Sequence, residues 1–224
     1  MSSQNLPSGW LGQQPKFGDL KLKLDSHKNS EFKVIAENNV IIKLTTGQPT
    51  KVVTKFTQVS KDKEQPEYVF VQRKNHDSIH FHLGFPDNGE YQFMIFALPE
   101  SDSTESLPNV YNYRITVDRI HRPAQPFLKA YSIFFKECCV LHKPLFLNSS
   151  SENLDRSRFE VVVPGAQKVA VHAKDEWTQL EKKGDTWVGT ADLLKYKGQN
   201  IKVTVNASFD KNASTYSVLL ETAV

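Results

Sequence analysis

The chain has 224 residues, of which 39% are hydrophobic and 24% are charged. This composition is typical of globular proteins and excludes a disordered chain, and the length suits two domains of about 100–150 residues each. The net charge is only +3, and basic and acidic residues are interspersed without the basic stripe of a nucleic-acid-binding protein, so we expect no nucleic-acid partner.

The sequence also argues against a membrane-spanning or secreted protein. The longest apolar runs, residues 94–98 and 133–135, are far shorter than the roughly 20 residues that span a bilayer. Residues 1–5 have neither the positive charge nor the apolar stretch of a secretory signal. The two cysteines, Cys138 and Cys139, are adjacent and cannot join distant parts of a core. These features predict a cytoplasmic protein.

The first half of the chain has the pattern of a β-sandwich. Residues 1–18 are expected to form a leader in which Trp10 and Leu11 could anchor on the first domain. From about residue 20 the hydrophobic period is two, which predicts strands. Alternating apolar positions are Leu20, Leu22 and Leu24; Phe32 and Val34; Ile79, Phe81, Leu83 and Phe85; Tyr91, Phe93 and Ile95; and Tyr111, Tyr113, Ile115 and Val117.

Turn residues divide these segments. The sequence Pro-Asp-Asn-Gly at residues 86–89 is a strong hairpin signal. The final hairpin of the first domain is predicted over residues 90–98 and 109–118. With strands about ten residues apart and no persistent 3.6-residue period, residues 19–122 are predicted to form one β-sandwich.

Pro123 and Pro126 limit the following segment to extended geometry and are predicted to mark the domain boundary. The second half then repeats the period of two. Its apolar positions are Phe159, Val161 and Val163; Val169, Val171 and Ala173; Ile201, Val203, Val205, Ala207 and Phe209; and Tyr216, Val218 and Leu220. Residues 123–224 are therefore predicted to form a second β-sandwich. The expected fold class is all-β, with two tandem immunoglobulin-like domains.

Two groups of residues are candidates for metal binding or catalysis. His80 and His82 share one strand face and could chelate a metal ion, or they could be ordinary solvent-facing side chains. Cys138 and Cys139 lie three to four residues from His142, in a segment that is predicted to be strand-like, where one of the two thiols is expected to be buried and inert. No catalytic motif is present in the sequence, so we expect a non-catalytic chain with no cofactor.

The aromatic residues of the second half suggest a further possibility. Trp177, Trp187, Tyr196 and Tyr216 could stack on sugar rings if they were exposed, or they could cover the sheet as core residues. Trp177 and Trp187 are the candidate ligand-binding residues in the first case. Carbohydrate or metal binding is therefore the alternative to a protein-interaction function.

Ordered features of the sequence resemble the kyphoscoliosis peptidase and hillarin family. They are the segment Gly9-Trp10-Leu11-Gly12-Gln13-Gln14-Pro15-Lys16-Phe17 with Leu24 and Ser26-His27, and then Pro144-Leu145, Phe159, Val163-Pro164-Gly165-Ala166, Val169-Ala170-Val171, Trp177, Leu180, Gly184, Trp187, Gly189, Tyr216 and Leu219-Leu220-Glu221. In that family these features lie downstream of a transglutaminase-like core with a Cys-His-Asp triad.

The resemblance implies a function without catalysis in this chain. No residue here corresponds to the family's triad, and neither Cys138 nor His142 is assigned to it. We expect a protein-interaction or scaffold module, cytoplasmic and associated with the cytoskeleton, that binds a protein partner. The resemblance also leaves open a regulatory part of a transglutaminase-like peptidase.

Overall fold

The computed structural model describes residues 6–104, 106–210 and 215–224. Contacts divide the chain into two compact units. The first unit comprises Met1–Val69 and His76–Gln125, and the second comprises Phe70–Asn75 and Pro126–Val224. The second unit therefore takes in a short segment from the N-terminal half, which the sequence pattern did not suggest. In the part of the chain that is described, no helix is long and apolar enough to cross a bilayer.

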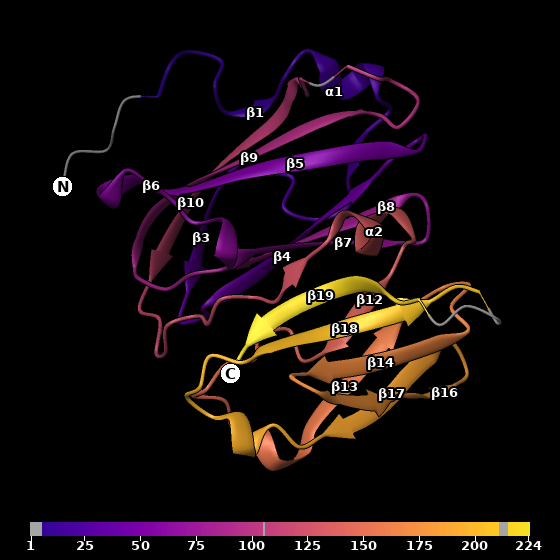
Figure 1. The fold of residues 1–224 in the computed structure, drawn as a ribbon. Helices are drawn as coiled ribbons and strands as arrows, with labels where there is room; N and C mark the ends of the chain where they lie inside the picture. The colour runs from indigo at the N-terminus through magenta and orange to yellow at the C-terminus, as the bar shows by residue number, and fades with distance from the viewer. Residues whose placement is uncertain (1–5, 105, 211–214) are drawn as a thin grey trace. The chain divides into compact units, whose positions relative to one another are not determined.

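The first unit is an antiparallel sandwich with one parallel edge pairing (Figure 1). Its larger sheet has the order β1-β10-β9-β5-β6, and β3 pairs in parallel with β10. In its other sheet β2, β4 and β8 lie in that order. The strands are β1 (Gly12–Gln13), β2 (Lys23–Leu24), β3 (Glu31–Ile35), β4 (Asn39–Thr45), β5 (Thr50–Gln58), β6 (Lys63–Glu64), β8 (Ser78–Gly84), β9 (Gly89–Pro99) and β10 (Asn109–Asp118).

Two details of this unit differ from the sequence prediction. The turn at residues 86–89 does not close a hairpin, because β8 pairs with β4 whereas β9 pairs with β5 and β10. The turn instead carries the chain from one sheet to the other. The predicted hairpin of residues 90–98 and 109–118 is present as β9 and β10.

The segment around Leu20 also differs. The alternating Leu20, Leu22 and Leu24 predicted a strand, but α1 (Lys16–Asp19) ends there and Lys21 has a left-handed backbone with φ 53°. Leu20 and Leu22 are nevertheless buried, because the turn directs both side chains into the core together with Phe17. Apolar residues two positions apart show only that their side chains point in the same direction. A tight turn can produce this as well as a strand.

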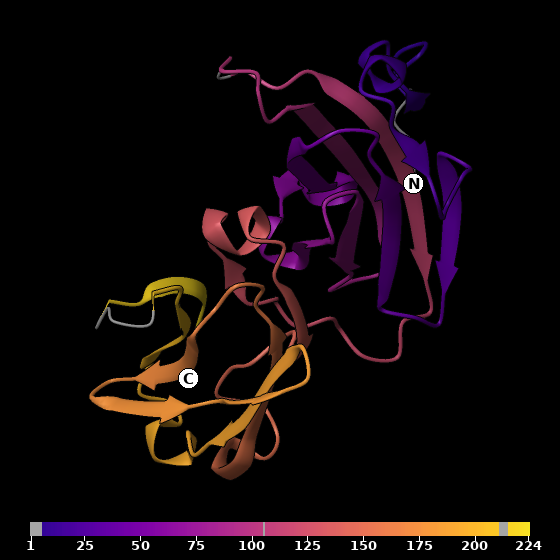
Figure 2. The ribbon, with the colours of Figure 1, turned by 90° about the vertical axis from the view of Figure 1, so that its right-hand side faces the viewer.

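The second unit is a sandwich of two antiparallel sheets (Figures 1 and 2). One sheet has the order β11-β19-β18-β14-β15, and the other has the order β12-β13-β17-β16. This arrangement matches the two sheets of an immunoglobulin domain. The strands are β11 (Lys129–Ala130), β12 (Val140–Lys143), β13 (Ser157–Val162), β14 (Lys168–Ala173), β15 (Glu176–Gln179), β16 (Glu181–Lys183), β17 (Thr186–Ala191), β18 (Lys202–Ser208) and β19 (Ser217–Ala223).

Two segments outside these sheets complete the second core. Helix α2 (Ser132–Lys136) contributes Phe134, and β7 (Val69–Lys74) contributes Phe70, whose ring centroid lies 5.6 Å from that of Phe134. The Gln72 side-chain oxygen accepts a hydrogen bond from the Leu141 N–H at 2.6 Å. The strand-like environment predicted for Cys138 and Cys139 is wrong, because both residues lie in the turn between α2 and β12.

Candidate interaction surfaces

The two histidines considered for metal binding both lie on the solvent side of β8. His80 and His82 are partly buried and alternate with Ile79, Phe81 and Leu83, which point into the core. Burial, with positive charge at His80 and Lys43, lowers the pKa of His82 to about 4. The described residues contain no group of three or more His, Cys, Asp or Glu side chains placed to hold a metal ion. These two histidines therefore have no third protein ligand of that kind within the described chain.

The thiols and His142 lie in different environments. Cys138 and Cys139 are buried, whereas His142 is exposed on β12. Burial raises the pKa of Cys139 to about 12, with smaller contributions from Glu137 and Cys138. A nucleophilic cysteine requires an accessible thiolate, and these surroundings favour the buried thiol form.

The structure separates the two candidate tryptophans. Trp187, on β17, is 7% exposed and belongs to the second core, as does Tyr196. Trp177, on β15 in the other sheet, is 48% exposed. Its ring centroid lies 4.4 Å from that of His172 and 4.9 Å from that of Tyr216. A sugar platform built from both tryptophans is therefore not formed, but a surface cluster of Trp177, His172 and Tyr216 is.

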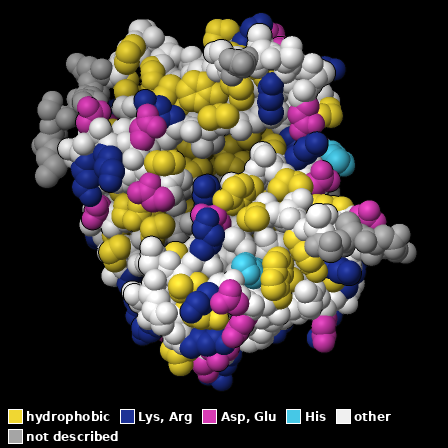
Figure 3. All heavy atoms as spheres, in the orientation of Figure 1, with side chains coloured by type: hydrophobic (Ala, Val, Ile, Leu, Met, Phe, Trp, Pro, Cys, Tyr) yellow, Lys and Arg dark blue, Asp and Glu magenta, His cyan; other side chains and the backbone are white. Residues whose placement is uncertain are grey.

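A second exposed group lies on the outer face of the larger sheet in the first unit. Along β9, Phe93, Ile95 and Ala97 are fully buried, and the residues between them point outward. The outward apolar set is Met94, Phe96 and Leu98, which are partly buried, and Val53 of β5, which is 56% exposed and directly opposite Phe96. We call this set the outer apolar face. Figure 3 shows hydrophobic side chains gathered in the region of β5 and β9.

Charged groups around the outer apolar face are paired. Lys55 forms an ion pair with Glu64 at 2.8 Å, and Arg114 pairs with Glu90 at 2.7 Å. The Lys51 ammonium donates to the Asp102 carbonyl oxygen at 2.6 Å. A neutral apolar centre within a polar rim is typical of a protein-binding surface. The sequence pattern did not identify this face. The signal was present, because residues 94–98 are apolar at odd and even positions alike, which indicates a strand that is apolar on both sides.

The described part of the expected leader, residues 6–18, belongs to the first unit. The Asn112 side-chain amide donates to the Trp10 carbonyl oxygen at 2.7 Å, and β1 pairs with β10. The Gln14 amide donates to the carbonyl oxygens of Gly9, Trp10 and Gly12. These contacts dock the leader along β10, beside the outer apolar face.

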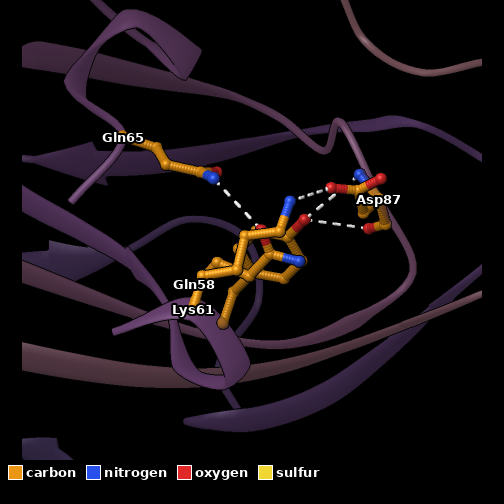
Figure 4. Close-up of polar contacts among 5 residues, drawn as sticks. Gln58, Lys61, Gln65 and Asp87 are labelled. Carbon is orange, nitrogen blue, oxygen red and sulfur yellow. Dashed lines mark hydrogen bonds and ion pairs between the residues drawn. The ribbon is translucent and has the colours of Figure 1, made fainter. Parts of the chain in front are cut away.

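A polar cluster organises the turn at residues 86–89 and is shown in Figure 4. Lys61 forms an ion pair with Asp87 at 2.5 Å, and the Tyr91 hydroxyl donates to the Asp87 carbonyl oxygen at 2.8 Å. The buried Gln65 amide donates to the Gln58 side-chain oxygen at 3.1 Å. These contacts fix the sheet-to-sheet crossing, and we assign the cluster a structural role.

Fold and surfaces together define an immunoglobulin-like chain that presents apolar surface. Residues 7–128 match the model of the KY-like, immunoglobulin-like domain family. The chain belongs to this family, which confirms the family resemblance noted in the sequence. The matched range does not reach residues 144–221, where the resemblance also has many of its features. No curated protein matches the chain.

Solved structures of immunoglobulin domains are similar to parts or most of the chain. One is Dpr1 IG1 bound to DIP-eta IG1, with 12% identity over 43% of this chain and 94% of that chain, at a TM-score of 0.26. Another is the titin Ig tandem A164-A165, with 10% identity over 85% and 90% and a TM-score of 0.24. The Ig1 domain of mouse SynCAM 2 has 12% identity over 39% and 89% and a TM-score of 0.23.

Proposed function

We propose that this chain is a non-catalytic protein-interaction module that serves as a scaffold for a cytoskeletal protein partner in the cytoplasm. The observation that carries the proposal is the outer apolar face. Val53 of β5 exposes more than half of its surface directly opposite Phe96, and Met94 and Phe96 extend the apolar area along β9. The cytoskeletal and cytoplasmic parts of the proposal are supported by the family resemblance of the sequence.

The geometry favours a protein partner over a small molecule at this face. Small-molecule sites are concave and enclose most of their ligand. The outer apolar face lies on a broad sheet whose rim charges are already paired within the chain. Such a face can bury an apolar surface of similar size without leaving a charge unpaired.

A charge placed within the outer apolar face tests the proposal. Val53→Lys is expected to reduce partner capture from an extract of the source organism by about tenfold or more, because a lysine buried against an apolar partner surface would lose water without gaining a counter-ion. Ile41→Lys is the matched control, since Ile41 is also an exposed apolar strand residue (37%) but lies on β4, in the other sheet. Both variants should retain the thermal unfolding midpoint of the parent chain.

Mass spectrometry of the captured proteins distinguishes the outcomes. Cytoskeletal proteins retained by Ile41→Lys and lost with Val53→Lys support the proposal. Capture that is equal in both variants contradicts the assignment of the face, and the absence of cytoskeletal proteins contradicts the scaffold role. A captured transglutaminase-like protein would favour a regulatory subunit instead.

A further inference from the structure

The short strands at the sheet ends differ in chemistry. Strand β6 consists of Lys63 and Glu64, and β16 consists of Glu181, Lys182 and Lys183. Charged residues on an edge strand oppose pairing with another chain. Strand β15, at the end of the other sheet of the second unit, reads Glu-Trp-Thr-Gln instead. Its last three residues carry no charge, so β15 lacks the protection that β6 and β16 have.

The register shows which backbone groups of β15 point away from its sheet. The Leu180 N–H donates to the Val169 carbonyl oxygen at 2.8 Å, so these two residues are a hydrogen-bonded pair. Hydrogen-bonded pairs alternate along an antiparallel ladder, which makes Thr178 opposite Val171 the next such pair. The N–H and C=O groups of Trp177 and Gln179 therefore point outward, toward the free edge.

The side chains beside these groups form an apolar platform. Trp177 is opposite His172 in a non-hydrogen-bonded pair, the closer type of pair, and their rings are in contact with centroids 4.4 Å apart. Tyr216 contacts the Trp177 ring as well, and its hydroxyl donates to the Gln179 side-chain oxygen at 3.3 Å. These contacts orient the indole, which remains 48% exposed.

The charges near the edge indicate what kind of segment it accepts. Glu176, the first residue of β15, forms an ion pair with Lys195 at 2.5 Å. The remaining β15 side chains are neutral. A charged residue placed against Trp177 would therefore lose water without gaining a counter-ion from β15 itself. The edge is complementary to an extended, uncharged backbone with an apolar side chain.

We propose that the free edge of β15 is a docking site for an extended, uncharged segment of a partner protein. The segment adds as an antiparallel strand, as in every strand pair of the second unit. Its backbone bonds to the outward groups of Trp177 and Gln179, and an aromatic or branched side chain packs on the Trp177 ring. This site lies in the second unit and does not depend on the outer apolar face.

Strand addition imposes a sequence rule on the segment. The residue opposite Trp177 must donate its own N–H to the Trp177 carbonyl oxygen, so proline cannot occupy that position. The residues on either side direct their N–H groups away from β15 and can be proline. This rule separates strand addition from binding of a polyproline helix, which needs no ladder of backbone bonds.

A displayed library of random 12-residue peptides provides the probe. Selection on the full chain with counter-selection on Trp177→Ala is expected to enrich peptides that have an aromatic or branched residue at one fixed position. The enriched peptide is then synthesised and its Kd measured by calorimetry. Trp177→Ala should weaken binding by about tenfold or more. Leu194→Ala, at another exposed apolar residue (51%), should change it less than about twofold.

Two measurements test the backbone ladder. Gln179→Pro removes an outward N–H that makes no ladder bond to β14, and it should weaken binding by about tenfold. N-methylation of the peptide residue opposite Trp177 should have a similar effect and leaves the protein unchanged, so it decides the question if Gln179→Pro does not fold. Equal affinity after both changes would overturn strand addition.

Other outcomes also bear on the proposal. The proposal is overturned if no peptide is enriched on the parent chain over Trp177→Ala. It is also overturned if no peptide binds and sedimentation shows self-association that Trp177→Ala abolishes, because the occupant of the edge would then be a second copy of the chain. Val53→Lys should leave peptide affinity unchanged, so this proposal and the proposed function can fail separately.

Discussion

The two units have related sandwiches but fill them differently. In the first unit, Phe56 stacks on Tyr91 with ring centroids 5.2 Å apart and also contacts Phe85 and Phe93. Phe56 lies on β5, and Tyr91 and Phe93 lie on β9. Phe85 is the residue directly after β8. The second core is mainly aliphatic along β14 and β18. Two of its large rings, Phe70 and Phe134, come from segments outside its two sheets.

This difference shows that two sandwiches with a similar strand pattern can draw the side chains of their cores from different parts of the chain. Apart from Phe17 of α1, the rings named in the first core are supplied by residues that alternate along its own strands. The second core takes Phe70 from a segment more than 50 residues upstream of its first strand, and the Arg73 guanidinium lies 4.2 Å from the centroid of the Phe135 ring. The second unit therefore includes residues from both sides of the Pro123–Pro126 segment.

Truncation of one ring in each core should produce the largest effects. Phe70→Ala removes a side chain that is 2% exposed and is expected to lower the free energy of unfolding of the second unit by about 3–5 kcal/mol. Phe56→Ala, at 1% exposure, should have a similar effect on the first unit. Chemical denaturation followed by hydrogen exchange assigns each loss to a unit. Destabilisation of the first unit alone by Phe70→Ala would contradict the assignment of residues 70–75.

The sequence pattern predicted the faces of most strands and the pairing of β9 with β10, but not the other strand partners. Alternation in residues 79–83 and 113–118 correctly separated buried from outward positions. It failed at Asn112, which is 1% exposed although its neighbours Tyr111 and Tyr113 are also buried, and whose side chain donates to the Trp10 carbonyl oxygen. It could not show that the turn at 86–89 changes sheets, because a two-residue period describes one strand and not its neighbour. For the same reason the sequence did not place residues 70–75 in the second core.

The exposure of the candidate binding residues could not be predicted from the sequence either. Trp177 and Trp187 are ten residues apart and lie on either side of the turn at residues 183–185, yet one is exposed and the other buried. The chain changes sheets at Leu180, between β15 and β16, and this crossing decides the difference. The exposed position of Val53 on β5 depends likewise on which face of the sheet is outward.

The free energies of unfolding of the two units should decrease over different pH ranges on acidification. The pKa of His82 falls from 6.5 unfolded to about 4 in the folded first unit. The unfolded state therefore takes up a proton first, and stability present above pH 6.5 is lost between pH 6.5 and 4, by about 1–2 kcal/mol after allowance for partial exposure. His82→Gln should reduce this loss, and a remainder is expected because burial also lowers the pKa of His27 in the same unit.

The second unit provides the contrast in this pH experiment. A hydrogen bond from Tyr131, with further support from Lys202, lowers the pKa of Glu221 below its usual 4.5. Its contribution is present above that pH and is lost only as pH falls through the lower folded value. Unfolding monitored for each unit between pH 7 and 4 should thus show a loss in the first unit alone. An equal loss in both units would contradict the assignment to His82.

A smaller effect is expected from the hydroxyl of Tyr91. Its ring packs in the first core, and its hydroxyl donates to the Asp87 carbonyl oxygen. Tyr91→Phe keeps the ring and should cost about 1 kcal/mol in the free energy of unfolding, the usual net value of one such bond. Tyr113→Phe is a related control at a second buried tyrosine, whose hydroxyl donates to the His27 carbonyl oxygen at 3.0 Å. An unchanged midpoint for Tyr91→Phe would show that the turn does not depend on this bond.

The smallest effect should come from Lys61, although its contact in the same cluster is the shorter one. The Lys61–Asp87 ion pair measures 2.5 Å, but both side chains are about 50% exposed. Water and salt screen exposed pairs, so Lys61→Ala should cost no more than about 0.5 kcal/mol and less at high salt. A double-mutant cycle with Asp87→Ala measures the coupling. A coupling energy larger than the loss caused by Tyr91→Phe would mean that the ion pair stabilises the crossing between the two sheets of the first unit more than the Tyr91 hydroxyl does.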